Sequence, residues 1–222
     1  MQQLPNEITN LFSYLKAGVS AYHVVAHSRQ QLLAAGFEEL SLKEEWDLER
    51  GGRYFCVPFG TTLYAFTVGS ECDLSNGVHI GGAHTDFPAI KIKPNPEIFT
   101  PGYMQLNTEV YGGPILNTFF DRPLSLAGKV VTRGERYDRP VSHLVDFKEP
   151  VLYLPNLAVH MNREVNEKGV PIDNQKHLLP LLGTIGETLS KDTKFTALLA
   201  DRFDLRQEDI LDYDLCVYNT EQ

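Results

Sequence analysis

The spacing of apolar residues predicts helices near both ends of the chain. Over residues 1–36 apolar side chains recur every three or four positions, which places them on one face of a helix, and Gly36 follows as a C-cap. Helical spacing returns over residues 175–189 and 194–202. The apolar positions of the first helical region are Ile8, Leu11, Leu15, Val19, Tyr22, Ala26 and Leu33.

Strand-like composition begins after this first helical region. Residues 53–59 and 61–68 are rich in aromatic and β-branched side chains and are separated by one glycine, which predicts a hairpin or a bulge. Residues 78–83 form a short apolar run that ends in glycines, and we expect a strand there. Residues 89–93 alternate between apolar side chains and lysine, which is typical of a half-exposed strand.

The composition of the sequence changes near Pro94. Three prolines and a glycine at positions 94, 96, 101 and 102 predict a loop, after which shorter strand candidates follow. A last strand that reaches the final residues without a closing element predicts a polypeptide that continues beyond Gln222. The candidate strands are residues 124–132, 141–147, 151–154 and 210–218.

The net charge and the cysteines restrict the partners and the compartment expected for this protein. The chain has 20 lysines and arginines against 29 acidic residues, a net charge of −9, which argues against nucleic acid as a partner. We see no signal peptide and no apolar run that approaches the length of a membrane span, so no membrane partner is expected. Cys56, Cys72 and Cys216 show no paired spacing and indicate buried thiols in a reducing compartment, the cytoplasm.

The stretch of residues 81–88 carries the most informative chemistry. It follows an expected strand, and ligands of open α/β sheets gather outside the carboxyl ends of strands. His84 and Asp86 are two residues apart, so they project from one face of an extended backbone. A neutral imidazole is a good zinc ligand, and a nearby carboxylate can orient its ring. The plain alternative, a core or turn histidine bonded to Asp86, is favoured by the spacing alone.

Other candidate chemistry in the sequence is weak. His23 and His27 share a helical face, but an ordinary amphipathic helix explains them. The pair Glu44-Glu45 lies in a charged stretch and is most simply a solvated face. The sequence contains no nucleophile elbow, no P-loop, no dinucleotide fingerprint and no zincin motif.

Four blocks of the sequence nevertheless occur in an order that resembles one family. Residues 80–94 contain Gly-Gly-Ala-His-Thr-Asp-Phe-Pro, which resembles the His-Thr-Asp-Ser-Pro block of M18 aspartyl aminopeptidases. Residues 109–130 resemble that family's Tyr-Gly-Gly and Trp-Phe-Asp-Arg-Asp-Leu…Ala-Gly-Arg-Val segments. Residues 154–163 and 212–216 match further blocks in the same order. The chain is therefore identified as a member of this family, covering its amino-terminal half.

The resemblance implies a zinc exopeptidase with two zinc ions in the complete enzyme, which removes acidic residues from the amino termini of peptides. The fold class it implies is α/β: residues 1–94 form the amino-terminal part of a zinc-exopeptidase α/β sandwich. Residues 95–222 form an inserted β-rich dimerisation domain that returns toward the catalytic domain at its end. His84 matches a zinc ligand and Asp86 the catalytic acid that orients it. His160 matches a histidine that binds substrate in the active site of a neighbouring subunit.

For His160, the sequence alone favours a packed histidine in a strand or turn. Asp121-Arg122 is read as an ion pair in the insert, since the family has no ligand there. The resemblance also implies homo-oligomerisation through the insert, into a tetrahedral dodecamer when the chain is full length. Phe87 and Pro123 depart from the family pattern and bear on pocket shape or packing.

The remaining zinc ligands of this family lie in blocks that the 222 residues do not contain. One imidazole cannot hold zinc tightly, so we expect the chain alone to be inactive. The alternative function is a catalytically inactive truncated product that acts only as an oligomerisation or binding module.

Overall fold

The computed structural model describes residues 5–71, 77–186 and 189–221. They belong to two compact units, Met1–Phe87 and Pro88–Gln222. Cys72, one of the three cysteines predicted to be buried, lies outside the described residues.

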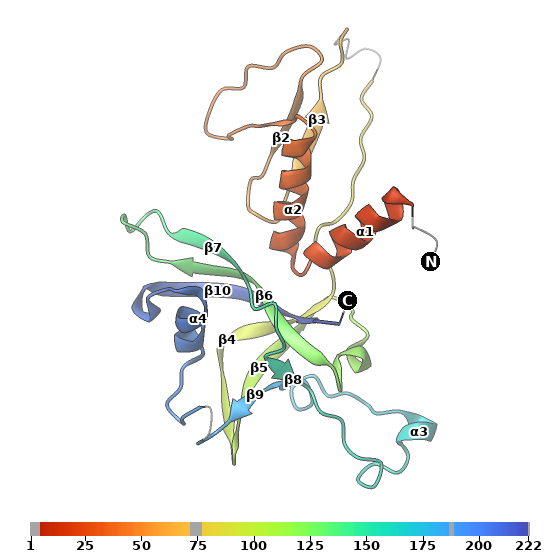
Figure 1. The fold of residues 1–222 in the computed structure, drawn as a ribbon, viewed down its shortest axis with the longest axis vertical. Coiled ribbons are helices and arrows are strands. Elements are labelled where there is room, and N and C mark those ends of the chain that lie inside the picture. Colours follow the sequence, from red (N-terminus) through yellow and green to blue (C-terminus); the bar gives the residue numbers. More distant parts are fainter. Residues whose placement is uncertain (1–4, 72–76, 187–188, 222) are drawn as a thin grey trace. The chain divides into compact units, whose positions relative to one another are not determined.

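In its described residues, the first unit combines two helices with a small mixed sheet (Figure 1). The strand order is β1-β2-β3, with β1 parallel to β2 and β2 antiparallel to β3, so the predicted hairpin is confirmed. Its buried apolar side chains come mainly from β2, where Tyr54, Phe55 and Cys56 are 0–4% exposed. The elements are α1 (Asn6–Ala17), α2 (Ala21–Ala34), β1 (Glu38–Glu39), β2 (Arg53–Cys56) and β3 (Tyr64–Thr67).

The helical spacing of the first residues is realised as two helices rather than one. Ser20 is extended and caps α2, because its hydroxyl oxygen accepts a hydrogen bond from the His23 backbone at 3.3 Å. Gly36 follows α2 with a φ of +79°, a left-handed conformation that glycine adopts without steric cost. The apolar spacing predicted the helices, and a polar cap sets the break between them.

The described residues of the second unit form a sheet of seven strands. Short helices connect them, and α4 follows β9 in the chain. The strands are β4 (Ala89–Thr100), β5 (Tyr103–Tyr111), β6 (Pro123–Thr132), β7 (Val141–Asp146), β8 (Leu152–Tyr153), β9 (Leu181–Thr184) and β10 (Ile210–Asn219). The helices are α3 (Val165–Lys168) and α4 (Phe195–Phe203), with 3₁₀ turns η2 (Leu116–Phe119) and η3 (Gln207–Asp209).

The sheet of the second unit closes on itself into a barrel. Its strand order is β10-β4-β5-β9-β8-β6-β7, and β10 also pairs with β6. Six strands therefore form a ring, and β7 pairs with β6 outside it. The β6–β10 pairing runs antiparallel from Ile210↔Thr132 to Asn219↔Leu124 and makes the long seam of the barrel.

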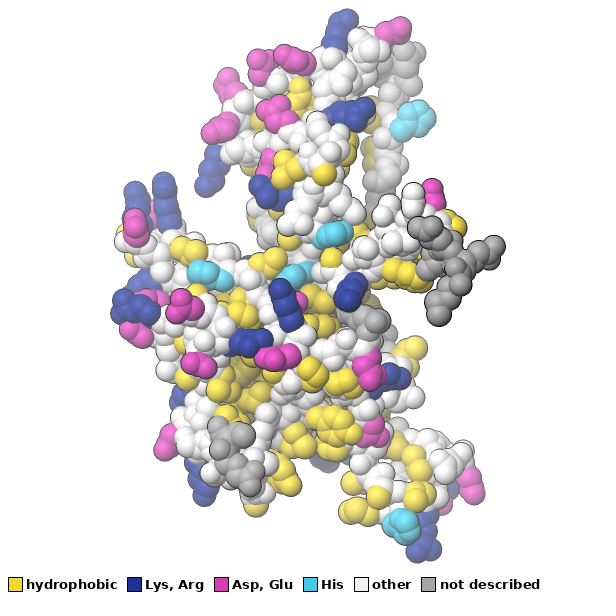
Figure 2. All heavy atoms as spheres, viewed as in Figure 1, with side chains coloured by type: hydrophobic (Ala, Val, Ile, Leu, Met, Phe, Trp, Pro, Cys, Tyr) yellow, Lys and Arg dark blue, Asp and Glu magenta, His cyan; other side chains and the backbone are white. Residues whose placement is uncertain are grey.

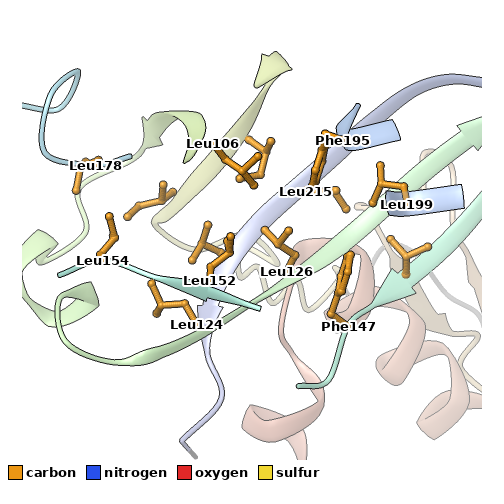
Figure 3. Close-up of a cluster of buried hydrophobic side chains, with 14 of the residues drawn as sticks. Leu106, Leu124, Leu126, Phe147, Leu152, Leu154, Leu178, Phe195, Leu199 and Leu215 are labelled. Atoms are coloured by element: carbon orange, nitrogen blue, oxygen red, sulfur yellow. The ribbon is translucent and has the colours of Figure 1, made fainter. Parts of the chain in front are cut away.

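The core of the second unit fills this barrel with aliphatic side chains (Figure 3). Leu124 and Leu126 of β6 and Leu215 of β10 are fully buried there. Phe195 and Leu199 of α4 pack into the same cluster. The first turn of α4 is held by β4, since the Glu97 carboxylate accepts a hydrogen bond from the Phe195 backbone at 2.8 Å. The helix thus covers part of the barrel core.

Several sequence-based expectations about the elements were wrong. Residues 78–83 form no strand, because within the described residues no neighbouring strand pairs with them and their side chains stay exposed. The loop expected after residue 94 is the second half of β4, where a register irregularity between Ile92 and Glu97 accommodates the two prolines. Within residues 175–189, β9 pairs with β5, and Pro180 breaks the helical pattern. β5 itself was not predicted.

The division of the chain at Phe87 and Pro88 reflects compactness rather than role. β4 crosses the expected boundary at residues 94 and 95 as one strand. The assignment of residues 1–94 to a catalytic domain and 95–222 to an insert stays a prediction.

The seam between β6 and β10 depends on Gly128, which has a φ of +155° and lies opposite Leu215. A Cβ at this position would overlap the Asp214 carbonyl oxygen. We expect Gly128→Ala to lower the free energy of unfolding by about 3 kcal/mol, measured by chemical denaturation. Gly113→Ala is the control, because nothing lies within 4 Å of its added Cβ. Equal stability of the two variants would contradict the proposed role of the seam.

Candidate functional site

His84 and Asp86 lie in an exposed, irregular segment of the first unit. The expected position at the end of a strand is not found, since residues 78–83 are not a strand and Ile80 is 89% exposed. The segment is instead held by Thr85, whose hydroxyl donates a hydrogen bond to the Thr61 carbonyl in the connection between β2 and β3 at 2.6 Å. This bond fixes the backbone between the two candidate side chains.

The structure brings His84 and Asp86 together. The Nδ1 atom of His84 lies 2.5 Å from the Asp86 carbonyl oxygen and 3.5 Å from the Asp86 carboxylate. A carbonyl oxygen can only accept, so Nδ1 carries the proton and donates it. The lone pair is then on Nε2, and the His84 side chain is 81% exposed. The predicted proximity of the pair is present, but the hydrogen bond goes to the backbone of Asp86 rather than to its carboxylate.

The residues described here do not amount to a zinc site by themselves. Nε2 of His84 is a suitable donor atom, because zinc prefers a neutral imidazole whose other nitrogen donates to an oxygen. A zinc site needs three or four such ligands, however, and no group of three His, Cys, Asp or Glu side chains gathers anywhere in the described ranges. The described part of this chain supplies one ligand position, His84.

His160 lies in the second unit, in a turn that follows β8. It is exposed, as are the neighbouring residues 155–161. Two short backbone bonds shape the turn: Met161 donates to Ala158 at 2.8 Å and Asn162 to Val159 at 3.2 Å. The histidine is therefore not packed in a strand, and its ring is open to solvent.

Asp121 and Arg122 are not an ion pair with each other. Arg122 pairs with Glu221 at 3.4 Å, whereas Asp121 accepts hydrogen bonds from Tyr153 and Asn156. Hydrogen bonds lower the pKa of Asp121 below its ordinary value. The largest effect comes from the Asn156 backbone, followed by the Asn156 side chain and then Tyr153. These bonds therefore stabilise the fold when Asp121 is ionised, and their contribution fades as the pH falls through the lowered pKa.

This cluster was not recognised from the sequence. The only local signal is that aspartate side chains often accept hydrogen bonds from backbone N–H groups in turns, which does not identify the donors. The tyrosine and asparagine that donate to it lie more than 30 residues further along the chain, and only the fold brings them together.

The His84 geometry predicts a specific tautomer. Because Nδ1 donates to a backbone carbonyl, we expect long-range ¹H–¹⁵N NMR spectra at pH 8 to show His84 with its proton on Nδ1. Asp86→Ala keeps that carbonyl and should keep the tautomer. A predominant Nε2–H form in the unsubstituted chain would contradict the geometry. His79, in the same exposed segment, serves as the reference ring.

Comparison with known proteins gives the chain its family. Residues 14–222 match the family described as aminopeptidase I zinc metalloprotease (M18). A probable M18 family aminopeptidase 2 of Clostridium acetobutylicum is 42% identical over 209 residues, which is 94% of this chain and 48% of that protein. The chain spans about half the length of the curated relatives it matches.

Solved structures show the same fold. A cryo-EM structure of the Ape4 and Nbr1 complex matches with a TM-score of 0.89 and 28% identity, over 99% of this chain and 46% of that chain. The structure of Chaetomium thermophilum mApe1 matches with a TM-score of 0.80 and 26% identity, over 96% of this chain and 50% of that chain. The expected mixed α/β fold class is confirmed. The protein belongs to the M18 family of zinc metalloproteases.

Proposed function

We propose that this chain forms part of an aminopeptidase that removes amino-terminal residues, acidic ones in preference, from peptides. The family match over residues 14–222 supports the aminopeptidase reaction. The preference for acidic residues rests on the resemblance of the sequence blocks to aspartyl aminopeptidases. Because the chain spans about half of its relatives, the activity proposed is that of the complete protein.

Three residues have proposed roles in this reaction. His84 is proposed as a zinc ligand through Nε2, a role supported by the Nδ1 hydrogen bond that leaves the Nε2 lone pair available. Asp86 is proposed to orient the His84 ring, now through its carbonyl as well as its carboxylate at 3.5 Å. His160 is proposed to contact substrate in a neighbouring subunit, which its exposed position in a turn supports. The number of zinc ions, two, is part of the same proposal.

We further propose that the 222-residue chain alone does not hydrolyse peptides. The residues described contain no cluster of three ligands that could hold zinc, which supports this proposal. The same absence among the described residues equally supports the second candidate function, an oligomerisation or binding module without catalysis. In both cases the insert of residues 95–222 is proposed to join copies of the chain into a homo-oligomer, a tetrahedral dodecamer for the complete protein.

The proposed location is the cytoplasm. Cys56 and Cys216 are buried thiols that form no disulfide in the described part of the chain, which suits a reducing compartment. Burial raises the pKa of Cys216 to about 12 and keeps this thiol protonated. None of the helices in the described ranges combines the length and apolar character needed to span a membrane.

Zinc content and hydrolysis test the incomplete site. We expect the purified chain to retain far less than one zinc per chain after dialysis, measured by atomic absorption, and to leave aspartyl and glutamyl anilides uncleaved. Robust hydrolysis by the 222-residue chain would overturn the proposal. Once a second polypeptide supplies the missing ligands, Asp86→Ala should lower activity about 10–100-fold and His84→Ala at least as much. His79→Ala is the matched control and should keep full activity.

Substitution of His160 tests the substrate contact. In the active assembly we expect His160→Phe to lower kcat/KM for an aspartyl anilide about tenfold, which corresponds to one lost hydrogen bond of about 1.4 kcal/mol. The oligomer, followed by size-exclusion chromatography with light scattering, should remain intact. An unchanged kcat/KM would count against the role of His160, and the nearby Met161→Leu is the control for local packing.

A further inference from the structure

The segment of residues 155–164, which carries His160, lies on the surface of the second unit. All but one of its side chains are exposed, and several are apolar, including Leu157 at 62% and Met161 at 74% exposure. Figure 2 shows hydrophobic side chains gathered on the surface around α3, with histidine and basic side chains beside them. Burial therefore contributes little to the position of this segment, and other interactions have to hold it.

Only two hydrogen bonds join the 155–164 segment to the barrel within the described part of the chain. Both come from Asn156: its backbone N–H donates to the Asp121 carboxylate at 3.0 Å, and its side-chain amide donates at 2.9 Å. The other bonds of the segment are local, such as those that close the turn around His160. The acceptor that fixes the start of the segment is thus a single carboxylate.

The backbone around Asp121 is arranged to present this carboxylate. Asp121 has a φ of +55°, a left-handed conformation that aspartate tolerates better than most residues. Its own N–H donates to the Leu154 carbonyl at 2.8 Å, and Tyr153 of β8 donates its hydroxyl to the carboxylate at 3.1 Å. Asp121 therefore binds the end of β8 and the first residues of the 155–164 segment at once.

The other end of the connection between β8 and β9 is held separately, by β5. The Thr108 hydroxyl donates to the Leu178 carbonyl at 2.5 Å, and the Gln105 amide donates to the Leu179 carbonyl at 3.0 Å. Leu178 is also fully buried. His160 is four residues from Asn156 and eighteen from Leu178, so an extended chain limits it to about 14 Å from the first anchor but about 60 Å from the second. The Asp121 anchor is the one that restricts His160.

We propose that Asp121 is a positioning residue for His160: its carboxylate fixes Asn156 and thereby sets where the following turn presents the imidazole. The inference rests on the proposed function, in which His160 contacts substrate. Asp121 itself touches no reacting atom in this scheme and acts through the backbone of the 155–164 segment.

Hydrogen exchange in the 222-residue chain tests the anchoring without any need for activity. Asp121→Gly removes the carboxylate while glycine keeps the positive φ without strain. We expect the hydrogen-bonded amides of the segment, those of Asn156, Met161 and Asn162, to exchange about tenfold faster, measured by mass spectrometry, while β6 and β10 keep their protection. A larger change is not expected, because Asp121 is exposed and water competes for its donors.

Asp204→Gly is the matched control. Asp204 has a φ of +53°, is also exposed, and its carboxylate makes no hydrogen bond within the described residues. Asp121→Asn, which keeps one acceptor oxygen and tolerates the same backbone, should show an intermediate rate. Unchanged exchange in Asp121→Gly, or equal acceleration in the Asp204→Gly control, would overturn the inference.

A double-variant cycle in the active assembly separates positioning from general stability. If Asp121 acts through His160, then Asp121→Gly lowers kcat/KM, and adding it to His160→Phe lowers kcat/KM no further. Multiplied losses in the double variant would refute the positioning role. An unchanged turnover of His160→Phe alone would contradict the proposed function. The exchange experiment would still decide whether Asp121 anchors the segment.

Discussion

The pairing of β10 with both β6 and β4 is the interaction on which the second unit depends. Without β10, the long strands β4 and β6 would each present an unpaired edge, and the barrel would be an open sheet. The last strand in sequence therefore lies between two strands that precede it by about a hundred residues. Side chains reinforce the pairing, since Lys91 pairs with Asp214 at 2.9 Å and Tyr213 donates its hydroxyl to the Lys93 carbonyl at 2.7 Å.

The same pairing explains why the sequence blocks that resemble the family are spread along the chain. Residues 89–94 lie in β4, 109–111 in β5, 123–130 in β6 and 212–216 in β10. These segments are hydrogen-bonded neighbours, because β4 pairs with β5 and with β10, and β10 pairs with β6. Close packing, as at Gly128 opposite Leu215, restricts which residues can occur there. Three of the four blocks thus contain segments that lie side by side in the barrel.

The sequence predicted elements well where the local pattern and the fold agree. The alternation in β4, the apolar run of β6 and the hairpin of β2 and β3 are examples. The sequence failed to predict elements whose formation depends on a partner strand far away in the chain. Residues 78–83 have strand composition but no partner strand among the described residues, whereas 181–184 become a strand because β5 lies beside them. Hydrogen bonding across the sheet, which the local sequence does not encode, made the difference.

The prediction of the candidate site from the sequence has the same limit. The spacing of His84 and Asp86 predicted their proximity, but which atom of Asp86 accepts the hydrogen bond depends on a backbone that Thr85 and Thr61 fix. For Asp121 the sequence suggested a partner next to it, and the fold supplied two others from further along the chain. Both histidines are exposed, so packing cannot orient them. Their geometry depends on polar neighbours, and a change in those neighbours would alter the site while every candidate ligand and substrate contact stayed in place.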